Sequence, residues 1–326
     1  MSGNERAGRA KKERARRGAI GRRAVLGGLA GLAGFASLAG PSGGGRARAA
    51  PSPLLHRSVP RTGARVPAVG LGSWITFNVG RDPELLASSA AVIEAFLAAG
   101  GTVIDSSPMY GSAQATIGRA LGARPGAAVF EADKVWTPRG EVAAEQVART
   151  QALWGRAPLA LLQVHNLVDW EAHLPMLLDM RERGMVGHVG VTTSHGRRHD
   201  ELERVMAGWP LDFVQLTYNP VDRAAEGRLL PLARERGQVV IVNRPFRGGS
   251  LPRALTRTPL PGFAGEIGAA DWAQLILKFI LSHEAETLPI PATTVPAHAT
   301  ENVDAARGAL PDDAMRLAIV EAIRSA

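Results

Sequence analysis

The 326-residue sequence contains no cysteine. Without cysteine the chain cannot form a disulfide framework, a Cys-ligated zinc site, a catalytic thiol or a lipidated cysteine anchor. The absence is compatible with either redox compartment, so it does not locate the protein. The eight histidines do not indicate a metal site, because His195 and His199, with Arg197 and Arg198 between them, are typical of a polar loop and a helix start. We predict no bound metal.

Most of the chain has no excess of positive charge, although the formal net charge of the whole sequence is +8. The first fifty residues hold eleven basic and two acidic side chains, and the remainder holds 27 basic and 28 acidic ones. Binding to the phosphate backbone requires clustered Lys and Arg. Residues 51–326 are therefore predicted to be a near-neutral globular body that does not bind nucleic acid.

Long apolar runs are also absent, and the first 49 residues have the layout of an export signal. A basic region over 6–23 precedes a weakly apolar stretch over 25–39, and the triplet Ala-Arg-Ala at 47–49 is a cleavage pattern. The apolar stretch is shorter than a membrane span of about 20 residues. The Arg pair at 22–23 stands directly before it and resembles a twin-arginine export signal.

We accordingly predict a twin-arginine-type signal peptide over 1–49, cleaved after Ala49, with the twin-arginine export machinery as a partner. The mature protein would be periplasmic or extracellular, with no stable membrane anchor after cleavage. The alternative is a disordered basic arm followed by an uncleaved helix.

Short β-branched runs alternate with helical patterns throughout the body. The predicted strand segments are 66–72, 102–105, 128–134, 159–165, 187–192, 212–217, 239–243 and 287–290. The predicted helical segments are 83–98, 113–121, 141–154, 174–183, 200–207, 226–236 and 272–283. Strands that are apolar on both faces and recur at intervals of one βα unit indicate a buried parallel sheet. We predict an α/β fold, a (β/α)8 TIM barrel whose floor is closed by an N-terminal β-hairpin, with a doubly wound open sheet as the competitor.

Chemistry in such a barrel takes place at the C-terminal ends of the strands. Asp105, Lys134 and His165 end three consecutive predicted strands, and Tyr110 follows Asp105 in the same loop. An ammonium group lowers the pKa of a neighbouring phenol, a carboxylate holds the ammonium in place, and an imidazole orients an oxygen or relays a proton. Such a set polarises a carbonyl group and protonates the alkoxide formed when a hydride arrives, which requires a nicotinamide cofactor.

Lysine and tyrosine are scarce, which makes this set more informative. Residues 51–326 contain only Lys134 and Lys278, and only Tyr110 and Tyr218. Lys278 lies within an amphipathic helical pattern and is predicted to lie on the helix surface. Taken singly, Asp105 with Lys134 fits a structural ion pair and His165 fits a core histidine, but the four together favour an active site.

With these residues the chain resembles the aldo-keto reductases, from about residue 57 to the C-terminus. The resemblance rests on VGLGSW (69–74), GGTVIDSSPMYGSA (100–113), KVW (134–136), LLQVHN (161–166), VGHVGVTT (186–193), VQLTYN (214–219) and IPATTVPAHATEN (290–302). It implies one barrel domain over 50–326 that reduces an aldehyde or ketone, its small-molecule substrate, to an alcohol with hydride from NAD(P)H. It also implies that Tyr110 is the general acid/base, that Lys134 and Asp105 tune its pKa, and that His165 orients the substrate.

The same resemblance implies a cofactor that lies extended across the barrel mouth. Thr192, Thr193 and Gln215 would hold the nicotinamide carboxamide, and Asn243 stands where the family often stacks an aromatic ring, with Phe246 or the plane of Arg244 as candidate substitutes. The other implied cofactor residues are Pro245, Gly248, Leu251, Ile290, Pro291, Thr293, His298, Glu301 and Asn302.

The choice between the two nicotinamide cofactors stays open in this sequence. Members that prefer NADP commonly carry Lys and Arg where this chain has Ala292 and His298, and phosphate recognition needs such cations. Arg247 or Arg253 are the candidates to supply the charge from the opposite loop. We predict NADP on family grounds, with NAD as the alternative.

The tryptophans at two strand ends, Trp74 and Trp136, are predicted to line the substrate pocket and to favour apolar or aromatic carbonyls. Two other functions fit the same residues. One is a regulatory barrel that binds a nicotinamide nucleotide as a sensor without turnover. The other is an aldolase that forms a Schiff base on Lys134, against which Asp105 argues, because a paired lysine stays protonated.

Overall fold

The structure is a computed structural model that describes residues 52–326. The predicted signal segment over 1–49 lies outside the described residues. Within the described part of the chain, no helix combines the length and the apolar character needed to cross a membrane.

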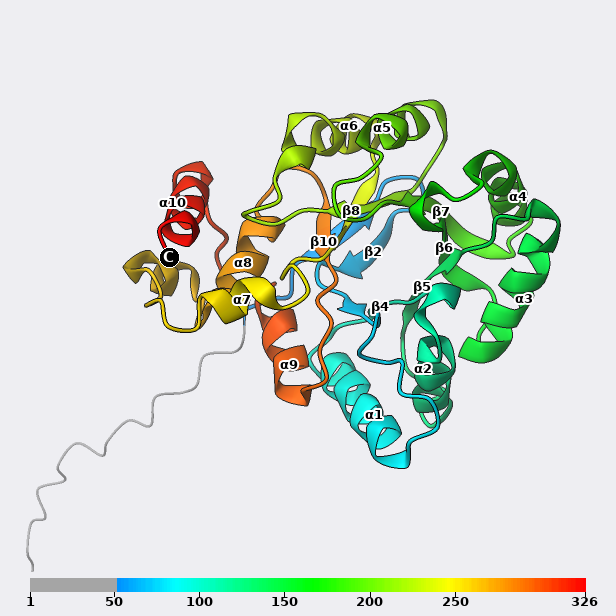
Figure 1. The fold of residues 1–326 in the computed structure, drawn as a ribbon, viewed down its shortest axis with the longest axis horizontal. Coiled ribbons are helices and arrows are strands. Elements are labelled where there is room, and N and C mark those ends of the chain that lie inside the picture. The colour runs from blue at the N-terminus through cyan, green and yellow to red at the C-terminus, as the bar shows by residue number, and fades with distance from the viewer. Residues whose placement is uncertain (1–51) are drawn as a thin grey trace, which may run out of the picture. The chain divides into compact units, whose positions relative to one another are not determined.

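Eight parallel strands form a closed barrel (Figure 1). They are β3 (Leu71–Gly72), β4 (Val103–Asp105), β5 (Phe130–Val135), β6 (Leu159–Val164), β7 (Val186–Thr192), β8 (Phe213–Thr217), β9 (Val239–Asn243) and β10 (Thr287–Pro289). Each strand pairs with the next one along the chain. The ring closes between β3 and β10, where the Gly70 and Gly72 amides donate to the carbonyls of Pro289 and Pro291 at 2.9 and 3.1 Å. The predicted (β/α)8 barrel is confirmed, and the competing open sheet is wrong.

A glycine permits this closure. A Cβ atom on Gly72 would lie 2.7 Å from the carbonyl oxygen of Ile290, closer than real Cβ contacts allow. Any larger residue at this position would therefore push the first and last strands of the barrel apart.

An antiparallel hairpin closes the N-terminal end of the barrel, as predicted. It consists of β1 (His56–Val59) and β2 (Ala64–Pro67). Val59 and Val66 are buried and pack in one cluster with residues of the barrel interior, including Phe213. Arg57 ties the hairpin to the last strand, β10, and to the segment before it, because it donates to the carbonyls of Thr287 at 2.8 Å and Leu281 at 2.6 Å.

Helices surround the strands as an outer layer (Figure 1). They are α1 (Pro83–Ala98), α2 (Ala113–Gly122), α3 (Ala143–Trp154), α4 (Trp170–Glu182), α5 (His199–Gly208), α6 (Leu229–Arg236), α7 (Ser250–Ala254), α8 (Trp272–Leu281), α9 (Pro296–Asp304) and α10 (Asp313–Arg324). Helix α1 has the predicted bounds, since Asp82 caps the amides of Glu84 and Leu85 and Pro83 occupies the first turn.

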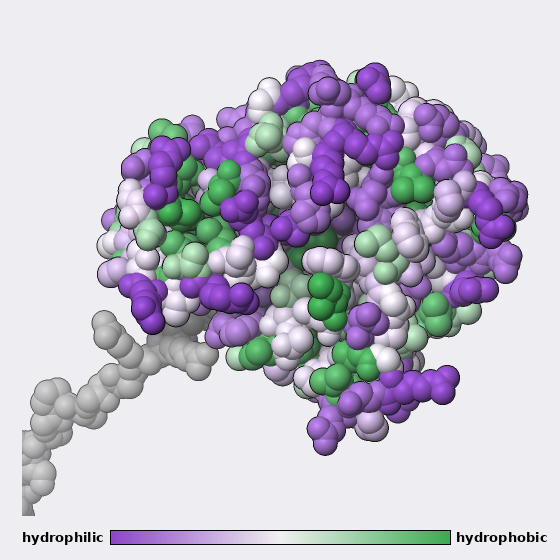
Figure 2. Space-filling model, in the orientation of Figure 1, coloured by the Kyte–Doolittle hydropathy of each residue, from purple (hydrophilic) through white to green (hydrophobic). Residues whose placement is uncertain are grey.

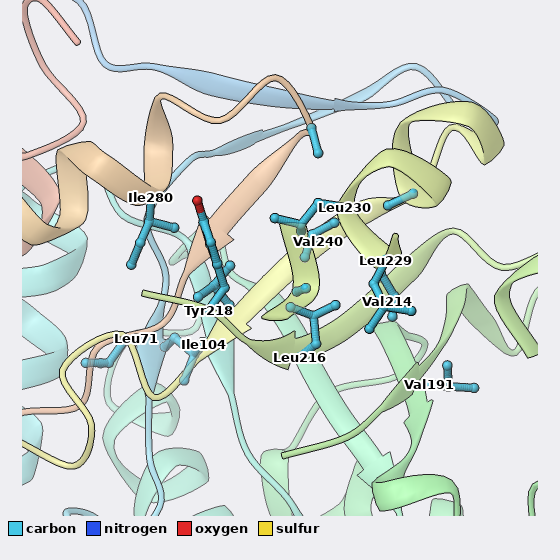
Figure 3. Packing of buried hydrophobic residues seen from close by; sticks show 14 of the residues in the cluster. Leu71, Ile104, Val191, Val214, Leu216, Tyr218, Leu229, Leu230, Val240 and Ile280 are labelled. Carbon is cyan, nitrogen blue, oxygen red and sulfur yellow. The ribbon is translucent and has the colours of Figure 1, made fainter. Parts of the chain in front are cut away.

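The main hydrophobic core lies between the strands and the helices. Figure 3 shows part of it, where side chains of β7, β8 and β9 meet those of α6 and α8. Val191, Val214, Leu216 and Val240 are fully buried there. Because strand side chains alternate, the residues between these valines and leucines point into the barrel, where the site lies.

Two predicted features differ in the structure. The run over 66–72 is divided, since its first part pairs in the hairpin and only Leu71–Gly72 belongs to the barrel. Lys278 was predicted to lie on a helix surface but is 1 % exposed. Its Nζ donates to the carbonyls of Arg307 at 2.7 Å and Ala309 at 3.0 Å, so it ties α8 to the segment after α9.

Candidate active site

A cavity of about 650 Å³ opens at the C-terminal end of the barrel. Its lining comes from seven of the eight strands or the loops that follow them, and includes Trp74, Asp105, Tyr110, His165, Gln215 and Asn243. Figure 2 shows a face that is hollowed near its centre, where apolar residues gather between hydrophilic ones.

Backbone strain is concentrated at this end of the barrel. In residues 52–326, the non-glycine residues with positive φ are Ile75, Asn166, Leu167, Asp169, His195, Arg198, Arg244 and Arg247. All eight lie in loops that follow the C-terminal ends of β3, β6, β7 and β9. A conformation that costs free energy persists where the surrounding structure fixes it, which is common at functional sites. Within residues 52–326, strained non-glycine backbone is thus confined to the loops at the C-terminal end of the barrel.

An ion pair joins Asp105, which lines the cavity, to Lys134 behind it. Lys134 Nζ lies 2.6 Å from Asp105 Oδ2 and donates to the carbonyl of Ser106 at 2.7 Å. Both side chains are almost fully buried. Burial alone would lower the pKa of Lys134 and favour the neutral amine, but Asp105, Tyr110 and Asp133 together outweigh burial and raise that pKa. Lys134 therefore remains an ammonium group, a poor nucleophile for a Schiff base.

Tyr110 lies above this pair. It ends the single 3₁₀ turn Pro108–Tyr110, and Lys134 Nζ is 5.2 Å from its ring centroid. Burial raises the pKa of Tyr110 to about 12, and the nearby Lys134 ammonium lowers it only in part. The net upward direction corrects the expectation of a lowered pKa: the phenol keeps its proton throughout the neutral range.

His165 completes the group. Its ring stands edge-on to Tyr110, with the centroids 5.7 Å apart and the planes at 87°. Burial, with a contribution from Lys134, lowers the pKa of His165 to about 3. The imidazole is therefore neutral at physiological pH, and only one of its two ring nitrogens carries a hydrogen.

Gln215 links these residues to the predicted cofactor site. Its Nε2 donates to Asp105 Oδ1 at 2.8 Å, so both oxygens of that carboxylate are paired. The hydroxyl of Thr192 accepts the Asn166 amide at 2.8 Å. The hydroxyl of Thr193 is buried and has no partner among the described residues. The unpaired hydroxyl of Thr193 is suited to a polar ligand group.

Both polar atoms of the Asn243 side chain are hydrogen-bonded to the protein. Its Nδ2 donates to the carbonyl of Thr193 at 2.8 Å, and its Oδ1 accepts the Thr217 hydroxyl at 2.6 Å. The side-chain amide is thereby fixed in the cavity wall, where its flat face can contact a ligand.

The other residues predicted for the site divide into two groups. Those that line the cavity are Trp74, Thr192, Thr193, Arg244, Pro245, Phe246, Gly248, Ile290 and Pro291. Those outside its lining are Trp136, Leu251, Thr293, His298, Glu301 and Asn302. Their assigned roles remain predictions.

The structure adds residues that the sequence analysis did not assign to the site. Ser107 contacts His165, and Ile75, Met109, Asn166 and Arg197 line the cavity. Ser107 follows the strand-end Asp105 by two residues, which is the one sequence signal that could have identified it.

Known proteins similar to this chain are oxidoreductases. The chain is similar to a methylglyoxal reductase of Escherichia coli, 26% identical over 245 residues, which span 73% of this chain and 84% of that protein. An NADH-specific methylglyoxal reductase of the same organism is 26% identical over 233 residues, 60% of this chain and 68% of that protein. Among solved structures, a glycerol dehydrogenase of Gluconobacter oxydans superposes with a TM-score of 0.69 at 18% identity and covers 83% of this chain and 95% of its own.

An aldo/keto reductase of Klebsiella pneumoniae, solved with NADP and acetate, superposes with a TM-score of 0.65 at 22% identity, over 79% of this chain and 92% of its own. At these identities the structures support the fold. The sequence profile of the Aldo/keto reductase family matches residues 68–323. This match confirms the predicted family and its oxidoreductase class, and we conclude that the chain belongs to the aldo/keto reductase family.

Proposed function

We propose that the protein reduces an aldehyde or ketone to an alcohol with hydride from NAD(P)H and a proton from Tyr110. The observation that carries the proposal is the convergence of Tyr110, His165 and the buried Lys134–Asp105 pair on one cavity. Asp105 holds Lys134 charged, and the ammonium stabilises the phenolate that Tyr110 becomes after it gives up its proton.

The reaction requires a nicotinamide, and residues of the cavity fit one. When bound, the reduced nicotinamide supplies the hydride. The free hydroxyl of Thr193 and the carboxamide of Gln215 suit a carboxamide group, and the fixed amide of Asn243 offers a flat face. Arg197 and Arg244 also line the cavity and have no acidic partner in residues 52–326, so they suit the anionic part of a nucleotide.

The positions of Tyr110 and His165 assign each residue a role at the substrate carbonyl group. The carbonyl oxygen would lie between the Tyr110 hydroxyl and the imidazole of His165, both of which line the cavity. Tyr110 transfers its proton to that oxygen as negative charge develops there. His165 is neutral and orients the oxygen by a hydrogen bond.

The substrate we propose is a small reactive aldehyde with an apolar group. Two relatives are methylglyoxal reductases. Trp74, Ile75 and Met109 are at least 40% exposed and line the cavity mouth, where they would contact such a group.

Binding and turnover are tested separately. Titration of the purified protein with NADPH or NADH should quench its tryptophan fluorescence. The protein should then reduce members of a panel of aldehydes. Tyr110→Phe should bind the same cofactor and lose at least about 100-fold in turnover, the usual contribution of a general acid. Full activity of this variant would remove Tyr110 from the mechanism.

The same preparation separates the alternatives. A sensor would bind the nucleotide but not oxidise it in a single turnover with a reactive aldehyde. An aldolase would form a borohydride-reducible adduct on Lys134, whose pairing with Asp105 opposes that chemistry.

For residues 1–49 we propose export by the twin-arginine route to the periplasm or the cell exterior. The proposal is supported by Arg22-Arg23 before the apolar stretch and by the Ala-Arg-Ala triplet at 47–49. This route carries folded proteins, so the barrel would bind its cofactor before export.

Export is tested by expressing the full chain in a bacterium and fractionating the cells. The exported protein should begin at Ala50. The double variant Arg22→Lys/Arg23→Lys should keep the protein in the cytoplasm, and its unchanged secretion would contradict the proposal.

A further inference from the structure

Ser107 contacts the imidazole of His165. Its Oγ lies 2.8 Å from His165 Nδ1, and both side chains are buried. His165 Nε2 has no partner among the described residues, and the ring lines the cavity. One nitrogen of the ring is thus held by the protein and the other is left for a ligand.

The direction of the Ser107–His165 hydrogen bond follows from the neighbours of Ser107. The Met109 amide donates to Ser107 Oγ at 3.2 Å, which uses one lone pair of the hydroxyl. The hydroxyl has one hydrogen to donate. Within residues 52–326 the acceptor in hydrogen-bond range of it is His165 Nδ1. Donation from Ser107 to Nδ1 satisfies the hydroxyl hydrogen, whereas donation from Nδ1 to Ser107 would leave that hydrogen without an acceptor.

The protonation of the ring completes the argument. His165 is neutral in the fold, because burial and the Lys134 ammonium disfavour the imidazolium. A neutral imidazole has one N–H group and one bare nitrogen. If Nδ1 accepts from Ser107, the hydrogen is on Nε2.

We propose that Ser107 is a positioning residue that fixes His165 as the Nε2–H tautomer, so that the imidazole donates its only hydrogen into the cavity toward the carbonyl oxygen. The inference rests on the proposed carbonyl reduction, and it specifies what His165 does there. The substrate oxygen would then receive two hydrogen bonds, from the Tyr110 hydroxyl and from His165 Nε2–H.

Ser107 also positions the other donor. It is the N-cap of the 3₁₀ turn Pro108–Tyr110, and its acceptance of the Met109 amide starts that turn. One hydroxyl group therefore holds the turn that carries Tyr110 and orients the ring of His165.

Kinetics of matched variants test the proposal. Ser107→Ala removes the donor and should lower kcat by about 10- to 100-fold, the range for outer partners that orient a functional imidazole. The KM for the aldehyde and the Kd for NADPH should each change by less than about twofold, because Ser107 contacts neither the substrate nor the cofactor. Ser107→Cys keeps the shape of the side chain, but its thiol is a weak hydrogen-bond donor. Its kcat should therefore fall as much as that of Ser107→Ala.

The control is the neighbouring Ser106, whose buried hydroxyl has no partner in the described part of the chain. Ser106→Ala keeps the backbone carbonyl that accepts from Lys134, so its kcat should stay within about twofold of the wild type. A wild-type kcat in Ser107→Cys would show that the shape of the side chain matters and its hydrogen bond does not. A loss of kcat in Ser106→Ala equal to that in Ser107→Ala would show that any change in this loop lowers activity. Either result overturns the proposal.

A spectroscopic measurement tests the tautomer without turnover. In protein labelled with ¹⁵N-histidine, the His165 signals, identified by their loss in His165→Gln, should show a bare, hydrogen-bonded Nδ1 and a protonated Nε2. A protonated Nδ1 would overturn the inference even if carbonyl reduction is established. Conversely, the expected tautomer in a protein that reduces no carbonyl would leave the contact intact and refute the proposed function alone.

Discussion

The surroundings of Tyr110 raise the pKa of its phenol, so the hydroxyl stays protonated at neutral pH. The phenol is half-buried beside the cavity, and the Lys134 ammonium only partly offsets the cost of burying a phenolate. Before any ligand arrives, the general acid is thus fully protonated, as carbonyl reduction requires. Lys134 contributes most at the moment when negative charge appears on the tyrosine oxygen.

The scarcity of tyrosine makes this state directly measurable. The chain has two tyrosines; burial raises the pKa of Tyr110 to about 12 and that of Tyr218 as well. In native protein, tyrosinate absorbance at 295 nm should therefore be absent up to about pH 10, whereas both residues should titrate near pH 10 in denaturant. Tyr110→Phe should remove one of the two tyrosine titration steps, and a native step below pH 10 would contradict the raised pKa values.

His165 should also make the fold sensitive to acid. Burial lowers the pKa of its ring to about 3 in the folded protein, against an ordinary value of 6.5. Between these two pH values the unfolded chain binds a proton at this histidine and the folded chain does not. The stability from the neutral ring is complete above pH 6.5 and is lost as the pH falls toward 3. Between pH 6.5 and 5 the loss is about 2 kcal/mol.

The measurement is urea unfolding at several pH values. His165→Gln should have a shallower decline of unfolding free energy below pH 6.5 than the wild type. His298→Gln, at an exposed histidine, is the control and should follow the wild type. Equal slopes in all three proteins would show that His165 is not the residue responsible.

Among the elements, the C-terminal helix α10 is attached by one side chain, Arg316, as well as by its apolar contacts. Arg316 donates to the Phe279 carbonyl at 2.5 Å, to the Ser282 hydroxyl at 2.8 Å and to the Tyr218 hydroxyl at 2.6 Å. Its guanidinium also lies 4.2 Å from the centroid of the Phe279 ring. The second tyrosine of the chain thus serves to attach a helix rather than to act in the cavity.

Removing this anchor should be costly. Arg316→Met should lower the unfolding free energy by about 3 kcal/mol, because it leaves buried acceptors unpaired. Arg324→Met on the same helix removes an exposed ion pair with Glu321 and should cost less than about 0.5 kcal/mol. Both values are obtained from denaturant unfolding, and equal effects would mean that the helix is held by its apolar contacts alone.

The elements also differ in how far the sequence could predict them. Helix α1 is predicted to the residue, because Asp82 and Pro83 mark its start. The short helices α7 and α9 and the terminal α10 were not predicted, since their positions depend on packing against a barrel that has to exist first. Lys278 shows the same limit: its helical pattern is amphipathic, but the carbonyls it contacts lie about thirty residues further along the chain.

At the site, the strand-end positions of Asp105, Lys134 and His165 could be predicted because a barrel brings strand ends together. The pKa of Tyr110 could not, because the charge effect of Lys134 can be inferred from sequence and the extent of burial cannot. The roles of Ser107 and of the fixed amide of Asn243 depend on hydrogen bonds between different loops, which leave no periodic signal.

The whole molecule is closed by contacts between its two ends. Arg57 of the floor hairpin donates to the carbonyl of Thr287, 230 residues away, and β3 joins β10 through the amides of Gly70 and Gly72. A barrel of this kind cannot close while it is being synthesised, because the last strand leaves the ribosome after all the others. At 5–20 residues per second this interval lasts roughly 10–60 s.

Throughout that interval the segment over 1–49 has already emerged, whereas the cavity does not yet exist. If that segment is an address, it can be read long before there is an enzyme to deliver. A cell that exports the folded barrel would therefore need to delay transport until β10 has docked, and the order of synthesis itself creates the need for such a checkpoint.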